Sequence, residues 1–544
     1  MEFNLIEKQW IPVLRRDGTR EMIAPHEVTD QFFENPVVSL NAPRPDFNGA
    51  LIQFLIGLVQ TVAAPQNGTE WKKKLVDPPA PDELLALSKP ERKAFELVGG
   101  KKRFMQSFEK LTDAKLLPIE QLLIDGPKQN TLELNKDHFV KRGTVNGICP
   151  SCCAMTLYAA QVNSPEGGPG FRTSLRGGGP LTTLVAGDGR FSTLWHLVWL
   201  NIMEDKKFLN LCNSELNRPS QKYPWRAKLR VAATEQDIHP VQYFWSMPRR
   251  ITLEQFALTA TCDLCGCNEE PVVTHYRELN RGTEYKAPMK HHLSPYDAGK
   301  GKAILTQSGG VIYRHWLGFV FHENGSGKEP ARVVNEYINN RHKSDWQFRI
   351  WSFGYDMVKA KACCWYETKF PLFMVDTKHL SKYEDLIFCV IKAADEVCGN
   401  LKIAMKRVFQ GVPEFDPIPK KTKWKYKDIK RLPAEEESER DRILNSMKKK
   451  SLFDAVETCF WQVTEPSYYQ LLEGITRTLE SGEDYSEQLK HWHRILCQAA
   501  LNQFDVQIVD GPFEYMKIKN ITLARDELIQ INSNGKSRRI LRLP

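Results

Sequence analysis

The sequence predicts an α+β fold, in which a large, loop-rich N-terminal domain of mixed α/β structure precedes a C-terminal four-helix bundle. Short runs of aromatic and β-branched residues alternate with glycine-rich loops through the middle of the chain, as expected for scattered strands. After about residue 375, apolar residues recur at helical spacing along several long segments. This change of pattern places the two domains at residues 1–374 and 375–544.

The composition predicts a soluble, cytoplasmic protein. A chain of 544 residues exceeds the size at which one core keeps growing, which agrees with two domains. Its contents of 42% hydrophobic and 26% charged residues are ordinary, and no segment has the apolar length needed to cross a bilayer. The N-terminus lacks a basic region followed by an apolar stretch, so we expect no signal peptide. Thirteen cysteines would be an odd count for a disulfide framework, and a net charge of +9 permits a nucleic-acid partner.

The N-terminal segment is expected to open with a hairpin over residues 10–23, with Asp17-Gly18 as its turn. Residues 48–63 carry apolar side chains at helical spacing and are expected to form a buried helix. Prolines and lysines dominate residues 66–108, which predicts connecting segments and solvated helix.

The middle of the chain, residues 139–370, is expected to be loop-rich with scattered strands, including the apolar runs at 312–321 and 346–353. Beyond it, four amphipathic helices joined by short connections would form the bundle. Their apolar stripes run through residues 386–408, 453–461, 468–475 and 489–500.

Two Cys-x-x-Cys pairs, Cys149 with Cys152 and Cys262 with Cys265, predict a structural zinc site in the N-terminal domain. The two-residue spacing lets a tight turn direct both sulfurs of a pair at one metal, and the pairs together complete a tetrahedral set of four thiolates. The long gap between them means that zinc would join two distant segments. The neighbouring Cys153 and Cys267 can replace a ligand, and buried free cysteines are the alternative interpretation.

Known catalytic motifs do not fit the sequence. It contains no His-x-Glu element of a zinc deaminase, no His-Glu-x-x-His helix and no His-Asp dyad. In Gly325-Ser-Gly-Lys328, a glutamate follows where a phosphate loop needs serine or threonine. A nuclease built on the cysteine pairs, with His291 or His292, is the remaining enzymatic alternative.

Several segments match one known family in order and spacing. Trp10-Ile-Pro-Val13 is similar to its opening strand, residues 50–61 to its first long helix, and the glycine-rich residues 165–183 to the passage that follows its first cysteine pair. The predicted helices at 391–409, 453–475 and 489–512 are similar in order and spacing. The chain thus resembles the CasA family, the large subunit of the type I-E CRISPR surveillance complex called Cascade.

This resemblance implies a subunit without enzymatic activity that recognises the protospacer-adjacent motif (PAM) in double-stranded DNA and helps the guide RNA open the duplex. Other Cascade subunits, CRISPR RNA and a helicase-nuclease that docks after opening would be its partners. The family's glycine loop corresponds to Gly167, Gly168 and Gly170, which can approach a narrow minor groove because they lack side chains. The family's strand-separating wedge falls on Lys359, where family members carry an amide; an exposed loop lysine is the alternative interpretation.

The resemblance implies two further contacts. Phe139-Val140-Lys141 is similar to the loop that anchors the 5′ end of the guide RNA, with an ordinary strand as the alternative. The family's minor-groove lysine aligns with Asn280, and Arg281 is the nearest cation, so Arg281 is the favoured candidate.

A separate basic run at residues 420–431 interleaves lysines with aromatic residues. Lys423 and Lys425 flank Trp424, an arrangement that holds single strands by charge and stacking. We expect this run to contact displaced or flanking DNA, with a solvated loop as the alternative.

Overall fold

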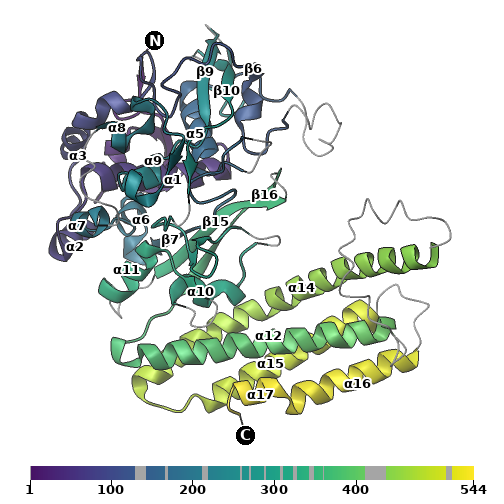
Figure 1. Cartoon of the computed structure of the whole chain (residues 1–544). Helices are drawn as coiled ribbons and strands as arrows, with labels where there is room; N and C mark the ends of the chain where they lie inside the picture. Colours follow the sequence, from purple (N-terminus) through teal and green to yellow (C-terminus); the bar gives the residue numbers. More distant parts are fainter. Residues whose placement is uncertain are drawn as a thin grey trace. The chain divides into compact units, whose positions relative to one another are not determined.

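The chain folds into two compact units (Figure 1). One comprises Met1–Val311 and Gly318–Leu372, and the other comprises Ile312–Leu317 and Phe373–Pro544. This is a computed structural model, and no helix in the part of the chain that it describes combines the length and apolar character of a membrane span. It describes residues 2–128, 143–165, 170–210, 219–257, 260–268, 271–286, 289–306, 310–322, 327–341, 348–358, 361–410, 437–509 and 518–543.

The first unit begins with the predicted hairpin. Strands β2 (Ile11–Arg15) and β3 (Arg20–Ile23) pair in antiparallel fashion, and β4 (Val37–Leu40) adds to the other edge of β2. Gly18 has a φ of +91°, a left-handed conformation that glycine adopts without steric cost. The predicted buried helix is also present as α1 (Pro45–Val62), with proline in its first turn.

Helix α1 is the centre of this unit's core. Its neighbours include α5 (Pro150–Val162), α6 (Leu194–Trp199) and α9 (Gln242–Trp245). Phe54 of α1 makes edge-to-face contacts with several buried aromatic rings, the geometry that aromatic pairs prefer. The rings around Phe54 are those of Trp10, Phe95, Phe104, Tyr158 and Trp245.

The segment expected to be connector and solvated helix is more ordered than that. It contains α2 (Gly68–Val76), α3 (Pro81–Ser88) and strand β5 (Glu96–Val98), which pairs with β1 (Phe3–Asn4). Trp71 and Phe95 are fully buried in this segment, and burial of aromatic rings is what ties such lysine-rich sequence to the core.

Two more three-stranded sheets complete the scaffold of the first unit. Strand β10 (Val273–Leu279) pairs with β9 (Arg250–Phe256) and with β6 (Leu116–Pro118). The predicted run at 346–353 becomes part of a long hairpin. Its strand β15 (Phe348–Val358) pairs with β16 (Lys361–Leu372) and, at its base, with β7 (Thr182–Gly187).

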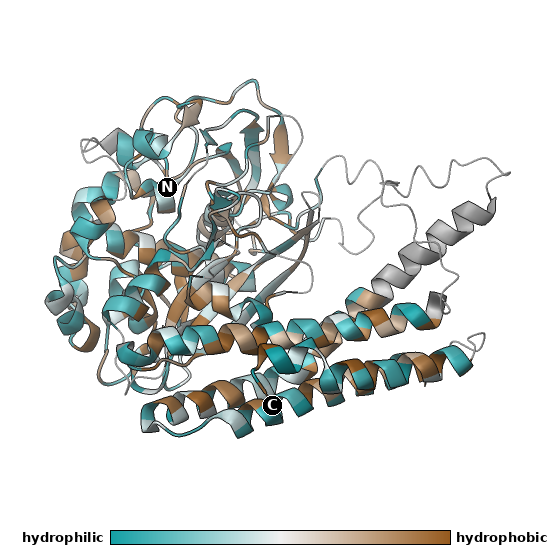
Figure 2. Ribbon diagram, turned by 60° about the horizontal axis from the view of Figure 1, so that its bottom comes forward, coloured by the Kyte–Doolittle hydropathy of each residue, from teal (hydrophilic) through white to brown (hydrophobic). Residues whose placement is uncertain are grey.

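The second unit is helical. Helix α12 (Leu380–Gln410) packs against α14 (Glu437–Ser481), α15 (Ser486–Phe504), α16 (Ile518–Asn534) and α17 (Lys536–Ile540). Along these helices, hydrophobic residues alternate with hydrophilic ones (Figure 2). The structure is therefore of mixed α/β type with C-terminal helices.

Two expectations are wrong, and one helix was not expected. The stripes at 453–461 and 468–475, expected as separate helices of the bundle, lie on one continuous helix, α14, which runs through Pro466 and includes the single helix at 453–475 that the resemblance implied. Helix α16 was not expected. The run at 312–321 is helical, with a 3-10 turn at Tyr313–His315 and α10 at Trp316–Val320, rather than a strand. Tyr313 belongs to the second unit, where its hydroxyl hydrogen-bonds that of Thr464 at 2.8 Å and its ring stacks on Tyr468.

Candidate functional site

Four cysteine sulfurs converge in the first unit. The sulfurs of Cys149, Cys262, Cys265 and Cys267 all lie within 4.8 Å of one another, and we call these residues the thiol cluster. Cys149 is the N-cap of α5, where its sulfur accepts the backbone N–H of Cys152 at 3.4 Å. Cys262, Cys265 and Cys267 lie in the connection between β9 and β10. The backbone N–H of Cys262 donates to the carbonyl of Cys267 at 2.9 Å, which closes that connection into a tight turn.

Cys152, a predicted ligand, borders the cluster. Its buried thiol hydrogen-bonds the thiols of Cys149, Cys262 and Cys265, and these bonds raise its pKa. The compact set of four contains Cys267 where the sequence favoured Cys152. The spacing of the cysteines gave no sign that Cys267, two residues after Cys265 in the same turn, would lie in this set in place of Cys152.

The donor set suits a tetrahedral zinc ion. With a zinc–sulfur distance of about 2.3 Å, tetrahedral geometry separates two sulfurs by about 3.8 Å, and Cys149 and Cys265 are 3.7 Å apart. Zinc binds the thiolate form, and the surroundings favour that form at two of the four positions, whereas burial contributes to a raised pKa at Cys149 and Cys267. A hydrogen bond with Cys152 lowers the pKa of Cys265 to about 6, and hydrogen bonds with Cys149 and Cys152 lower the pKa of Cys262.

Two elements run from the thiol cluster to the predicted DNA-reading residues. Helix α5 begins at the cluster and ends shortly before Gly170, and its 13 residues span about 20 Å. Strand β10 begins at Val273, which forms a β-bridge with Ile148 beside Cys149. Its 7 residues span about 23 Å and end two positions before Arg281. The cluster therefore lies at the far ends of both elements.

Gly170 and Arg281, predicted to read DNA from separate parts of the sequence, are in direct contact. The backbone N–H of Arg281 donates to the carbonyl of Gly170 at 2.7 Å. Gly170 has a φ of +85°, and a β-carbon there would lie 3.2 Å from the β-carbon of Asn280, so glycine suits the position in both respects. We call these two residues the reading pair.

The side chain of Arg281 is available to a ligand. The residue is exposed, and within the described residues no ion pair involves its guanidinium. Its φ of +61° is rare for a residue with a β-carbon and is held by the bond to Gly170. Arg281 is therefore an exposed cation with a strained backbone, directly beside the backbone of Gly170.

The remaining predicted contacts lie outside the described residues. These are Gly167, Gly168, Lys359, Lys423 and Lys425, together with Phe139, Val140 and Lys141.

Sequence reasoning missed a buried network at the hairpin that leads to position 359. Tyr355 of β15 donates its hydroxyl to Asp46 at 2.5 Å, and Asp46 also accepts from Arg44 at 2.9 Å. Arg44 also forms an ion pair with Asp125, with 2.8 Å between Nη2 and Oδ1. Asp46 and Tyr355 are buried, and the two carboxylates raise the pKa of Arg44 against the opposing effect of its burial. This network fixes the hairpin to the start of α1.

His291 and His292 were the candidates for catalysis. His291 and His292 stack on each other at 4.8 Å between ring centroids and are 3% and 0% exposed. Burial holds the pKa of both rings well below the usual range. Neither ring reaches solvent, so neither can contact a nucleic-acid substrate in this conformation.

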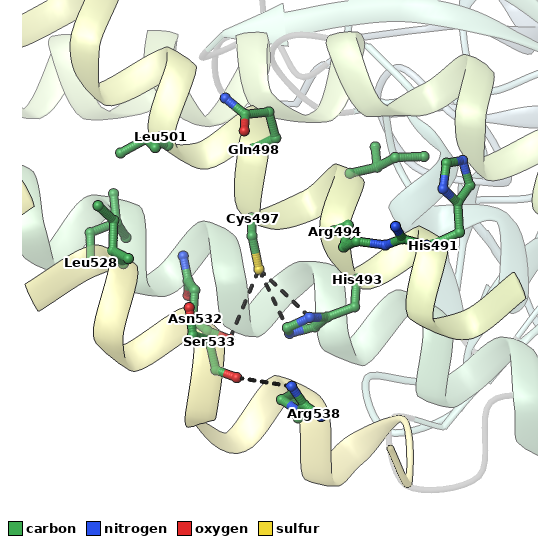
Figure 3. Close-up of a pocket in the computed structure, with 12 residues that line it drawn as sticks. His491, His493, Arg494, Cys497, Gln498, Leu501, Leu528, Asn532, Ser533 and Arg538 are labelled. Atoms are coloured by element: carbon green, nitrogen blue, oxygen red, sulfur yellow. Dashed lines mark hydrogen bonds between the residues drawn. The ribbon is translucent and has the colours of Figure 1, made fainter. Parts of the chain in front are cut away.

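A cavity of about 620 Å³ lies in the helical unit between α15 and α16 (Figure 3). Cys497 lies there between His493, 3.7 Å from its sulfur, and the carbonyl of Asn532. Burial raises the pKa of Cys497 to about 11 and lowers that of His493. The thiol is therefore protonated at neutral pH, and this pair is not an activated nucleophile.

The fold is similar to that of solved CasA and Cse1 structures. CasA from Thermus thermophilus superimposes with a TM-score of 0.67 at 16% identity, covering 98% of this chain and 100% of that one. Cse1 from Acidimicrobium ferrooxidans gives 0.63 at 14% identity, covering 99% of each chain. A chain of a CRISPR RNA-guided surveillance complex gives 0.66 at 12% identity, covering 98% and 100%.

The sequence identifies the family itself. The model of the CRISPR-associated protein Cse1 family matches residues 4–503. The chain belongs to this family, which confirms the resemblance drawn from its motifs.

Proposed function

We propose that this chain is the large subunit of a type I-E Cascade complex, recognises the PAM in double-stranded DNA and helps to start strand separation. The contact between Gly170 and Arg281 is the observation that carries this proposal. It joins two residues that are 111 positions apart in the sequence and that family resemblance had assigned separately to the minor groove.

The reading pair suits a minor groove about 6 Å wide. Gly170 presents backbone without a side chain, and the adjacent guanidinium of Arg281 supplies the positive charge that a narrow groove attracts. Separating one base step costs about 1.4 kcal/mol of stacking, so a few contacts suffice to start guide pairing. Lys359, between β15 and β16, would act as the wedge by holding the separated strands through phosphate contacts.

The thiol cluster would hold zinc as a structural ion. A metal bound by four thiolates has no open position for water or substrate, so its contribution is to fold stability. Cys149 would fix the start of α5, while Cys262, Cys265 and Cys267 would fix the turn before β10. Cys152 is the alternative ligand.

The subunit would have no catalytic activity of its own. The buried His291 and His292 do not support the alternative of a stand-alone zinc-containing nuclease. Purified chain with magnesium or manganese should leave DNA intact. Cleavage lost on His291→Ala or His292→Ala would favour the nuclease instead.

Membership of a Cascade complex implies the partners of this subunit. The subunit would act in the cytoplasm with other Cascade subunits and CRISPR RNA, whose 5′ end Phe139, Val140 and Lys141 would anchor. Once DNA is open, it would provide the docking site for the helicase-nuclease. Lys423 and Lys425 would contact flanking or displaced DNA. Co-purification of the tagged chain with CRISPR RNA and the other subunits tests this assignment, and a chain recovered only alone would contradict it.

Arg281→Ala in the assembled complex tests the recognition step. Loss of a groove contact should reduce the preference for PAM-bearing over PAM-less duplex by about tenfold. Arg230→Ala is the control, because Arg230 is an exposed arginine of the same unit that pairs with Asp237. Equal effects of the two variants would show that only general charge is involved.

A further inference from the structure

Arg249 lies immediately before β9, and its side chain is directed to the glycine-rich segment. It is 9% exposed, and its Nη2 donates to the carbonyl of Pro165 at 2.7 Å. Its guanidinium carbon also lies 4.9 Å from the centre of the Phe171 ring, a cation–π contact. One side chain thus holds residues on both sides of Gly170.

The backbone of Arg249 is fixed just as firmly to α5. Gln161, which is fully buried near the end of that helix, accepts the backbone N–H of Arg249 at 3.1 Å. The same amide donates to the carbonyl of Arg249 at 3.0 Å. This two-way pairing leaves the arginine little freedom to shift relative to α5.

Arg249 also contacts the segment that carries Arg281. Its Nη1 donates to Glu278 of β10 at 3.4 Å, and both side chains of this ion pair are largely buried. Gly282 packs directly on its backbone, since a β-carbon at Gly282 would lie 1.9 Å from the carbonyl oxygen of Pro248 and 3.1 Å from the nitrogen of Arg249. Gly282, the residue after Arg281, is therefore in close contact with the backbone at Pro248 and Arg249.

We propose that Arg249 is a positioning residue that holds Gly170 and Arg281 in register, so that PAM discrimination depends on a side chain remote from the DNA contact itself. This inference rests on the proposed function. The planar guanidinium makes three kinds of contact at once, a hydrogen bond, a ring stack and an ion pair, whereas a lysine ammonium on a flexible stem cannot maintain all three.

Arg172 provides a matched control. It also links the two segments, through an ion pair with Glu284 at 2.9 Å, but the two side chains are 31% and 43% exposed. Exposed ion pairs contribute little to stability. Changing Arg249 and Arg172 separately to lysine therefore compares a buried arginine with several contacts and a more exposed arginine with one ion pair.

The first measurement follows hydrogen exchange of the Arg281 amide, which donates to Gly170. In Arg249→Lys this exchange should be faster by about tenfold, because local opening becomes easier, while Arg172→Lys should stay within about twofold of wild type. Phe171→Leu, which removes only the ring stack, should lie between them. Unchanged exchange in Arg249→Lys would overturn the inference whatever the DNA results.

The second measurement compares affinity for PAM-bearing and PAM-less duplexes in the assembled complex. Arg249→Lys should lower the ratio of the two affinities by about tenfold, whereas a general loss of fold would weaken both and leave the ratio unchanged. Faster exchange with an unchanged ratio would overturn the inferred role in recognition. If the wild-type complex shows no PAM preference, the proposed function fails, and the exchange result still decides whether Arg249 holds the pair.

Discussion

Replacing Cys265 by serine tests whether a metal holds the thiol cluster together. Cys265 is exposed, so the substitution removes little packing, but its sulfur lies 3.7 Å from that of Cys149, 116 residues away. Treated as a cross-link that closes a loop of this length, the metal would stabilise the fold by about 5 kcal/mol. The first unit contains about 370 residues, for which the unfolding entropy is about 0.8 kcal/mol per degree. Loss of the metal should then lower the Tm by about 6 °C.

The assay combines metal analysis with thermal unfolding. Wild-type protein expressed with zinc should carry one metal ion per chain, and a chelator should lower its Tm to that of Cys265→Ser. The chelator should not change the Tm of the variant. Cys363→Ser is the control, because Cys363 is also an exposed thiol of the first unit but lies outside the cluster.

Two results would refute this reasoning. Wild-type protein that carries no metal after expression with zinc would leave the cluster as buried free thiols. Equal Tm values for Cys265→Ser and Cys363→Ser would show that the cluster contributes nothing to closing the loop between α5 and β10.

Three other predictions concern pH, the hairpin network and salt. Burial lowers the pKa of His196 to about 4, whereas a histidine in the unfolded chain has a pKa near 6.5. Titration of His196 therefore does not reduce the free energy of unfolding above pH 6.5, and it lowers that free energy by up to about 3 kcal/mol as the pH drops toward 4. His196→Gln should flatten this slope in urea unfolding, and an unchanged slope would contradict the assignment. Tyr355→Phe removes a hydrogen bond to the buried carboxylate of Asp46 and should lower the unfolding free energy by about 2 kcal/mol, measured by urea unfolding; a loss below about 0.5 kcal/mol would show that the network is not a stabilising contact. Lys423→Ala with Lys425→Ala should reduce the slope of log affinity against log salt by about 2 if both contact duplex phosphates, whereas an equal slope would remove them from the interface.

Local patterns in the sequence predicted the helices that are buried on all sides or along one apolar stripe. The run from Leu51 to Val59 is buried along its whole length in α1, and the stripe through Val390, Val397 and Leu401 is fully buried in α12. Helix α16 shows why others were missed. Ala524 and Leu528 are buried, but so is the polar Asn532, while Leu523 and Ile529 are exposed. Its apolar residues therefore only partly mark the face that packs.

The candidate site was predictable in its residue types and not in its arrangement. The spacing of cysteines indicated thiolate ligands, yet the choice between Cys152 and Cys267 depends on how the turn before β10 meets the start of α5. Arg249 gave no signal at all. Its role depends on contacts with Pro165 and Glu278, which are distant in sequence, and an arginine beside a strand is ordinarily solvated.

The thiol cluster and Arg249 act at opposite ends of the same two elements. The cluster fixes the start of α5 and the turn before β10, whereas Arg249 joins Gln161 near the end of α5 to Glu278 near the end of β10. Sites about 20 Å apart usually contribute to stability additively. Recognition would behave differently, because both constraints act through the contact of Arg281 with Gly170. Once Arg249→Lys has loosened that contact, adding Cys265→Ser should lower the Tm further but change PAM discrimination little.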